Sequence, residues 1–252
     1  MARIAFWGDS LTEGVPGAAY IDLLKREMPQ HTILNYGKGG DTVRSLYTRA
    51  ARMQTRSEES LQAEIVVLWV GVNDLLPDLA WFYPPMKRVV GQPWARSEAE
   101  FVEYYRSLLE LFRPHCRRLW AVSPLCIGED LDNRWNRQLE GQSRLIEQLI
   151  GEVSSTDFEA AFLDVRSEFE QEFSKLGNKK SEIISQFLPV NPVKAAIDVL
   201  AYRSAARADR RAELRGLFFT MDGVHLNSRG AGKVGRFFRN AVECLEHTER
   251  TG

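Results

Sequence analysis

The segment Phe6–Leu11, with the sequence FWGDSL, joins two stretches of different pattern. The apolar run Ile4–Trp7 predicts a strand buried in the core, and Leu11–Arg26 begins a helix-like stretch. The chain must therefore turn sharply at the Gly-Asp-Ser between them. Open α/β sheets bind their ligands where parallel strands end and helices begin. Ser10 lies at such a position, which makes it a candidate nucleophile.

Apolar runs alternate with helix-like stretches along the rest of the chain. The predicted strands are nearly continuous in apolar residues, as is typical of strands covered on both faces: Ile4–Trp7, Thr32–Asn35, Glu64–Val70, Arg118–Ser123 and Ala161–Val165. The predicted helices are Ala18–Met28, Val43–Met53, Glu98–Phe112, Trp135–Val153 and, last, Arg229–Glu246. This alternation predicts a parallel sheet with right-handed crossovers and helices on both faces.

Composition restricts the class of protein. The chain has 252 residues, 44% of them hydrophobic, which suits one α/β domain over residues 1–252. A net charge of -1 gives no reason to expect nucleic acid as a partner, and the absence of any apolar run of 18 residues predicts no integral membrane segment. The first strand follows Met1 so closely that we expect no signal peptide.

The three cysteines are widely spaced and form no CxxC pair. This pattern predicts free thiols in a reducing compartment and no metal site. We therefore expect a cytoplasmic protein.

Two segments interrupt the alternation, and we interpret both as insertions. Leu75–Arg96 is rich in proline and aromatic residues and is too long for a simple loop, so it is a candidate lid or substrate-pocket wall. Packing of those aromatics over the sheet edge is an equally good interpretation. Residues 172–217 contain a turn bounded by Pro189 and Pro192 and then a basic helical stretch, Arg203–Arg215. Interspersed acidic residues favour a solvated helix face there over a site for an anionic substrate group.

A serine hydroxyl becomes a good nucleophile only when a base takes its proton. Among four histidines, His225 is the best candidate, because Asp222 lies three residues before it and the last helix follows. On a turn, Asp222 can accept a hydrogen bond from one imidazole nitrogen and leave the other nitrogen for Ser10. The remaining histidines are expected to be surface or capping residues: His31, His115 and His247.

Acyl transfer also needs hydrogen-bond donors for a developing oxyanion. The second strand runs into a glycine-rich segment that ends at Gly40, and the third runs into GVND, which contains Asn73. Both positions fall at the same carboxyl edge of the sheet as Ser10. Asp9 and Asp74 are expected to brace their loops by side-chain to backbone bonds. No GxGxxG, GxxxxGK[ST] or GxSxG pattern is present, which disfavours a nucleotide site and the α/β-hydrolase fold.

Four short blocks resemble those of the SGNH (GDSL) hydrolases and occur in that family's order. They are Gly8–Leu11, Gly40–Thr42, Gly71–Asp74 and Asp222–His225, so the resemblance spans nearly the whole chain. Each block alone is weak, but the ordered set is highly specific. The resemblance implies a flavodoxin-like, three-layer α/β/α fold with a central five-stranded parallel sheet, and serine esterase chemistry.

The family's residue roles carry over position by position. The resemblance implies that Ser10 is the nucleophile, His225 the general base and Asp222 the residue that orients it. It also implies an oxyanion hole made by the backbone N–H groups of Ser10 and Gly40 and the side chain of Asn73. No metal or organic cofactor is expected.

The favoured function is a serine esterase that hydrolyses a small-molecule acyl ester through an acyl-enzyme. A carbohydrate O-deacetylase or an O-acyltransferase would use the same residues, so the motifs do not separate these alternatives. A non-catalytic binding module is a third hypothesis, which the intact set of catalytic residue types disfavours. The acyl chain, the alcohol part and the oligomeric state are left open by the sequence.

Overall fold

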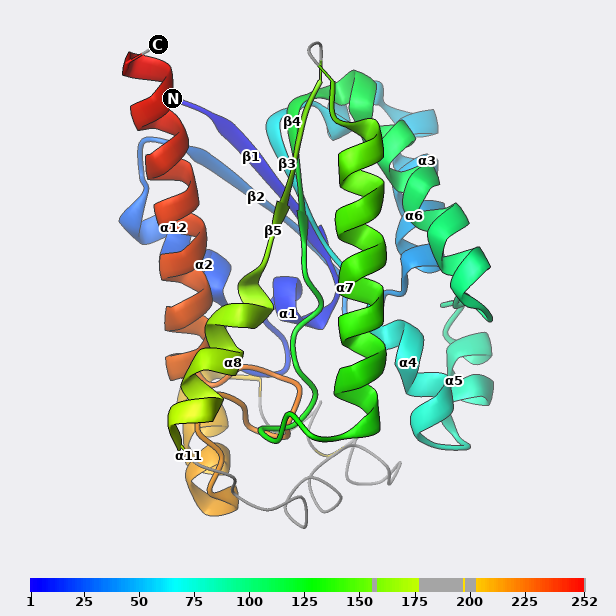
Figure 1. The fold of residues 1–252 in the computed structure, drawn as a ribbon, viewed down its shortest axis with the longest axis vertical. Helices are drawn as coiled ribbons and strands as arrows, with labels where there is room; N and C mark the ends of the chain where they lie inside the picture. The colour runs from blue at the N-terminus through cyan, green and yellow to red at the C-terminus, as the bar shows by residue number, and fades with distance from the viewer. Residues whose placement is uncertain (156–157, 177–196, 198–202, 252) are drawn as a thin grey trace.

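The computed structural model describes residues 1–155, 158–176, 197 and 203–251. A five-stranded parallel sheet has the order β2-β1-β3-β4-β5, which is the flavodoxin-like order (Figure 1). Its strands are β1 (Arg3–Gly8), β2 (Thr32–Gly37), β3 (Ala63–Trp69), β4 (Cys116–Val122) and β5 (Glu159–Leu163). The five predicted strands are therefore confirmed, with small shifts at their ends.

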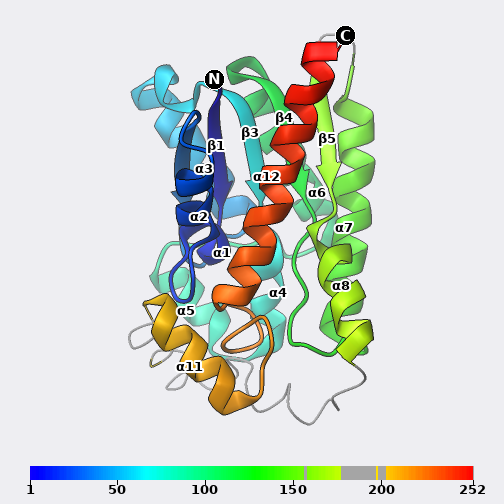
Figure 2. The same cartoon turned by 90° about the vertical axis from the view of Figure 1, so that its left-hand side faces the viewer.

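Helices cover both faces of the sheet and make the expected three layers. Figure 2 shows α12 (Ser228–Thr251) and α2 (Tyr20–Glu27) in front of the sheet, and α8 (Val165–Leu176) lies on the same side. The other face carries α3 (Val43–Arg56), α6 (Glu98–Phe112) and α7 (Arg134–Val153). Each face has its own hydrophobic core, because alternate residues of β1 point in opposite directions: Phe6 into one and Trp7 into the other.

The predicted helix Ala18–Met28 corresponds to α2, but the helix-like stretch Leu11–Arg26 is interrupted shortly after Ser10. A short helix, α1 (Ser10–Glu13), ends at Gly14, and α2 begins only at Tyr20. Gly14 has φ 80°, a left-handed conformation that glycine adopts readily, and its N–H donates to the Ser10 carbonyl. This glycine cap stops the helix one turn after the nucleophile candidate.

More than half of the segment Leu75–Arg96, predicted as an insertion too long for a simple loop, is helical. It contains most of α4 (Val72–Leu79) and all of α5 (Tyr83–Val89), which lie beyond the carboxyl ends of the strands (Figure 1). Two prolines stand in the first turn of α5, where a missing N–H costs no intrahelical bond. The aromatics divide: Phe82 and Tyr83 are buried, whereas Trp81 is exposed.

The second predicted insertion is described only at its ends. The last part of α8 and all of α11 (Ala205–Arg215) belong to it, and the turn at Pro189 and Pro192 lies outside the described residues. The prediction of a solvated basic helix holds for Arg207 and Arg210. It is wrong for Arg215, which is buried and donates from Nη1 to the Met221 carbonyl over 2.9 Å. The division into one domain with two insertions stays a prediction.

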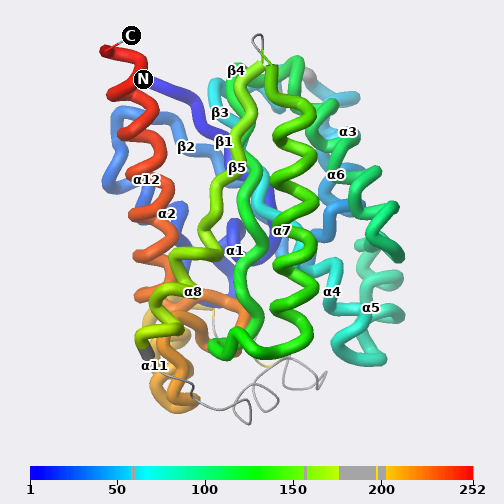
Figure 3. Tube along the Cα trace, in the orientation of Figure 1, coloured from blue at the N-terminus to red at the C-terminus, as the bar shows by residue number. Residues whose placement is uncertain are grey.

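Both chain ends lie at the same end of the molecule, away from α1 (Figure 3). In the part of the chain that the structure describes, no helix has the length and apolar character needed to cross a bilayer.

Candidate active site

The sheet register brings three predicted site segments to one edge. Gly8 at the end of β1 lies between Gly37 of β2 and Trp69 of β3. The chain leaves the sheet at each of these residues, so the segments that carry Ser10, Gly40 and Asn73 start side by side. This is the switch point of a doubly wound sheet, where the connections after two neighbouring strands run to opposite faces of the sheet.

Ser10, His225 and Asp222 form a continuous hydrogen-bonded relay. Ser10 Oγ lies 3.0 Å from His225 Nε2, and His225 Nδ1 lies 2.7 Å from Asp222 Oδ2. An ionised carboxylate only accepts hydrogen bonds, so Nδ1 carries the imidazole proton and Nε2 accepts from the serine hydroxyl. The structure thus brings together residues 215 positions apart in the sequence.

The carboxylate of Asp222 is buried and held in the ionised form. Its Oδ1 accepts from the N–H groups of Val224, at 3.0 Å, and His225, at 2.8 Å. Burial acts to raise the pKa of Asp222, but His225 and these two N–H groups outweigh burial, and the pKa lies below its ordinary value. Asp222 is therefore a fixed negative charge behind the imidazole.

The backbone N–H groups of Ser10 and Gly40 are candidate donors for an oxyanion. Gly40 has φ 78°, and among the described residues neither its N–H nor that of Ser10 has a hydrogen-bond partner. The glycine loop approaches the serine closely, since a Cβ built at Gly39 would lie 3.9 Å from Ser10 Cβ. Free N–H groups next to a nucleophile can bind a developing oxyanion.

Asn73 stands in the first turn of α4, where Gly71 makes the exit from β3 with φ 139°. The Asn73 amide donates to Asp9 Oδ2 over 2.9 Å. This bond orients the side chain with its nitrogen toward Asp9, the residue before Ser10, and an amide nitrogen has a second hydrogen to donate. All five predicted site residues therefore meet at one edge of the sheet.

Asp9 and Asp74 brace their loops as predicted. Asp9 Oδ1 accepts from the Leu11 N–H at 2.9 Å, and Asp74 accepts from the N–H groups of Val43 at 2.9 Å and Ala95 at 3.3 Å. Both carboxyls are buried, and burial raises the pKa of Asp9 to about 6 and that of Asp74 to about 7.

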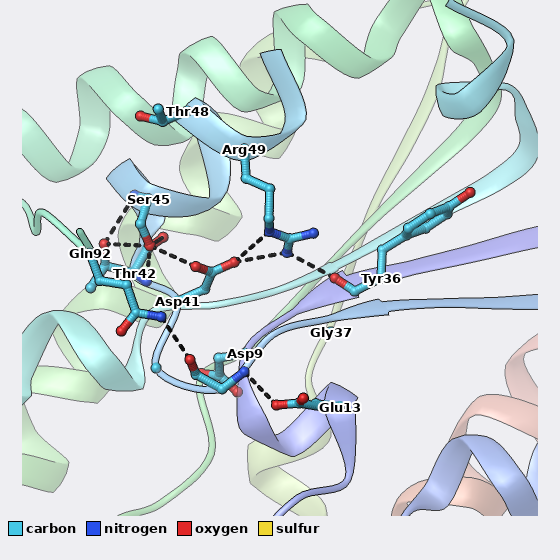
Figure 4. Close-up of polar contacts among 12 residues, drawn as sticks. Asp9, Glu13, Tyr36, Gly37, Asp41, Thr42, Ser45, Thr48, Arg49 and Gln92 are labelled. Atoms are coloured by element: carbon cyan, nitrogen blue, oxygen red, sulfur yellow. Dashed lines mark hydrogen bonds and ion pairs between the residues drawn. The ribbon is translucent and has the colours of Figure 1, made fainter. Parts of the chain in front are cut away.

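Hydrogen bonds from several elements hold the glycine loop after β2 (Figure 4). Glu13 of α1 accepts from the Gly39 N–H at 2.6 Å. Asp41 accepts from Ser45 Oγ at 2.9 Å and from Arg49 Nε at 2.8 Å, which ties the loop to α3. The loop is thus anchored on both sides of Gly40.

Three residues that touch this site were not predicted. Lys87 of α5 donates from Nζ to the Gly40 carbonyl, and Gln92 Nε2 donates to the Gly39 carbonyl over 2.7 Å. Glu129 accepts from the backbone of residues 218–220, just before Asp222. No motif marks these residues, because their contacts join segments far apart in the sequence.

The other three histidines lie outside the relay, but two of them are buried, contrary to the surface position expected. His31 Nδ1 accepts from the Ala2 N–H at 3.2 Å, and His115 lies 3.1 Å from both Gln54 and Gln62. Both nitrogens of His115 therefore have polar partners, whereas the buried Nε2 of His31 makes no hydrogen bond among the described residues and lies 3.4 Å from Glu246 Oε1. His247 is exposed on α12. Among the described residues, no group of three or more His, Cys, Asp or Glu side chains could hold a metal ion.

The family described as "GDSL-like Lipase/Acylhydrolase" matches residues 4–238, and the chain belongs to this family. It is therefore an enzyme of the ester hydrolases. No curated protein matches the sequence significantly.

Several solved structures have a similar fold. The acetyl xylan esterase AlAXEase has a TM-score of 0.61 and 22% identity over 95% of this chain and 99% of its own. LAE5, an alpha/beta hydrolase enzyme from the metagenome of Lake Arreo, Spain, has a TM-score of 0.63 and 17% identity over 97% of this chain and 96% of its own. Axe2, an acetylxylan esterase from Geobacillus stearothermophilus, has a TM-score of 0.59 and 19% identity over 94% of this chain and 92% of its own. Together they show the SGNH hydrolase fold.

Proposed function

We propose that the protein hydrolyses carboxylic acyl esters through an acyl-enzyme on Ser10. The observation that carries this proposal is the relay from Ser10 Oγ through His225 to Asp222, with contacts of 3.0 and 2.7 Å. A hydroxyl in contact with an oriented, unprotonated imidazole nitrogen is poised to lose its proton as it attacks.

Each residue has one part in the reaction. Ser10 Oγ attacks the ester carbonyl carbon while its proton passes to His225 Nε2, and Asp222 stabilises the resulting imidazolium. The Ser10 and Gly40 N–H groups and the Asn73 amide bind the oxyanion of the tetrahedral intermediate. His225 then protonates the departing alcohol, and water releases the acid from the acyl-enzyme by the same steps.

A carbohydrate O-deacetylase is the second candidate, and the structural relatives favour it. Two of them are named as acetyl xylan esterases. Three further structures of Axe2 are catalytic mutants in which a histidine, a serine or an aspartate is replaced by alanine. The same three residue types form the relay here, which supports one chemistry for both proteins. An O-acyltransferase would differ only in the acceptor that replaces water.

The test is hydrolysis of p-nitrophenyl esters from acetyl to long acyl chains, with wild type beside Ser10→Ala. We expect wild-type turnover and a loss of at least about 10³-fold in kcat for Ser10→Ala, because the nucleophile is gone. Ser174→Ala is the matched control, since Ser174 is exposed on α8, and it should leave kcat unchanged.

The chain-length series separates the candidates. Turnover confined to acetyl esters, with release of acetate from acetylated sugars, would favour the deacetylase. Ester products formed with added alcohols would favour the transferase. Turnover that persists in Ser10→Ala would overturn the proposed mechanism.

A further inference from the structure

We propose that Lys87, on α5, and Gln92, just after α5, are positioning residues of the oxyanion hole. This inference rests on the proposed function, because it assigns to these residues the task of fixing the Gly40 N–H. Neither residue would touch the ester. They act through the backbone of the glycine loop.

The first observation concerns a single peptide group. The carbonyl of Gly39 and the N–H of Gly40 belong to the same peptide plane. Gln92 Nε2 donates to that carbonyl over 2.7 Å, and the Gly40 N–H has no partner among the described residues. A hydrogen bond to the carbonyl end polarises the peptide and makes its N–H a stronger donor. Gln92 therefore both aims and strengthens the N–H proposed to bind the oxyanion.

The second observation concerns the next peptide along the chain. Lys87 is fully buried, and its ammonium donates to the Gly40 carbonyl. Burial lowers the pKa of Lys87 to about 8, and the nearby charges of Asp74, Asp9 and Asp41 oppose this fall, so the ammonium form persists at neutral pH. With the carbonyls before and after it both held, the left-handed conformation of Gly40 is fixed.

The fit between the loop and Gln92 is close. A Cβ built at Gly40 would lie 2.5 Å from Gln92 Oε1, so only glycine leaves room for this contact. Gln92 is itself buried, and its backbone N–H donates to the Lys87 carbonyl over 2.9 Å. The end of α5 and the residues just after it thus supply both donors, Lys87 to the Gly40 carbonyl and Gln92 to the Gly39 carbonyl.

The test is Gln92→Met, which keeps the length of the side chain and removes the donor. With p-nitrophenyl acetate we expect kcat to fall about tenfold and KM to stay within about twofold, because a misplaced or weakened oxyanion donor affects the transition state more than substrate binding. The affinity for an alkyl boronic acid, whose adduct with Ser10 places an oxygen in the oxyanion hole, should fall by the same factor. Val89→Ala, an exposed position on α5, is the control and should leave kcat and inhibition unchanged.

A merely structural role gives different results. Wild-type kcat and boronate affinity in Gln92→Met, or a fall in thermal midpoint without the selective loss in kcat, would overturn the inference. If Gln92→Met does not fold, Gln92→Ala, which also removes the donor, is measured in its place, and the same selective loss in kcat is expected. A wild type without Ser10-dependent turnover is a separate result, which overturns the proposed function and this inference together.

Discussion

Asp9 connects two candidate parts of the site through its two carboxylate oxygens. Oδ1 accepts from the Leu11 N–H and so shapes the turn that presents Ser10, while Oδ2 accepts from the Asn73 amide. Only an acceptor at Oδ2 can keep the Asn73 nitrogen turned toward the site. The carboxylate is fully buried, so this orientation is obtained at a cost in stability.

Asp9→Asn should therefore lower activity and raise stability near neutral pH. The asparagine would present an amide nitrogen to Asn73, which favours a flip of the Asn73 amide and removes one oxyanion donor. We expect kcat to fall at least about tenfold, since loss of such a donor typically costs about 10²–10³ in rate.

The stability effect follows from the pKa of Asp9, which burial raises from 3.8 to about 6. Native Asp9 binds more protons than unfolded Asp9 between these values, so the wild type loses stability as pH rises through this window, by roughly 3 kcal/mol. Asn cannot ionise, so the free energy of unfolding of the variant, measured in urea, should rise relative to that of the wild type between about pH 4 and 7. Asp22→Asn, at an exposed position on α2, is the control. A variant with wild-type kcat, or with the wild-type slope of stability against pH, would contradict this role.

At the scale of single residues, the sequence predicted the candidate site residues that are marked by short motifs and by their position after a strand. Ser10, Gly40 and Asn73 each follow a strand, and Asp222 lies three residues before His225, so pattern and spacing were sufficient. Lys87 and Gln92 could not be predicted in this way. Their function depends on α5 lying against the loop after β2, and that contact is a property of the fold.

At the scale of elements, the loop that carries Asp222 and His225 depends on one carboxylate. Glu129 accepts from the N–H groups of Phe218 at 2.5 Å, Phe219 at 2.7 Å and Thr220 at 2.9 Å, and from Thr220 Oγ1 at 3.0 Å. These residues connect α11 to the relay. A loop between helices would otherwise leave these backbone donors without fixed partners.

Glu129→Gln should loosen this loop. A glutamine has one acceptor oxygen, and its amide nitrogen would face a backbone N–H donor. We expect a loss of about 2 kcal/mol in the free energy of unfolding and a several-fold fall in kcat, because an unsatisfied buried donor is costly and His225 follows directly. Urea unfolding and ester turnover measure the two effects.

Glu140→Gln is the matched control for this substitution. Glu140 makes an exposed i,i+4 pair with Arg144, which contributes little to stability. Equal effects of the two substitutions would show that Glu129 is not a special support of the loop.

Element types were predicted better than their ends. The apolar runs gave all five strands and the long helices, because burial on both faces leaves a strong pattern. The hydrophobic pattern did not predict that Gly14 would end α1 after one turn. It also did not predict the helices within Leu75–Arg96. In the second case, Pro84 and Pro85 occupy the first turn of α5, where a helix tolerates them, and Pro77 lies inside α4.

At the scale of the molecule, the sheet separates two cores that β1 connects. On one face Phe6 packs against Tyr20 and Phe238, with ring centroids 5.9 and 5.2 Å apart. On the other face Trp7 packs against Tyr36 and Phe112, at 4.3 and 5.0 Å. The candidate site lies at the end of this same strand, so both cores support the position of Ser10.

Two cores without shared side chains should contribute independently to stability. We expect Phe238→Leu and Phe112→Leu each to lower the free energy of unfolding by about 1–2 kcal/mol, and the double variant to equal their sum within about 0.5 kcal/mol. Phe6→Leu combined with Phe238→Leu is the control on one face, where the rings touch and the effects should differ from additivity by about 1 kcal/mol. Urea unfolding of the wild type, the single variants and the two double variants measures both couplings. If the coupling across the sheet were as large as the coupling within one face, β1 would transmit packing between the layers, and the two cores would form one cooperative unit beneath the site.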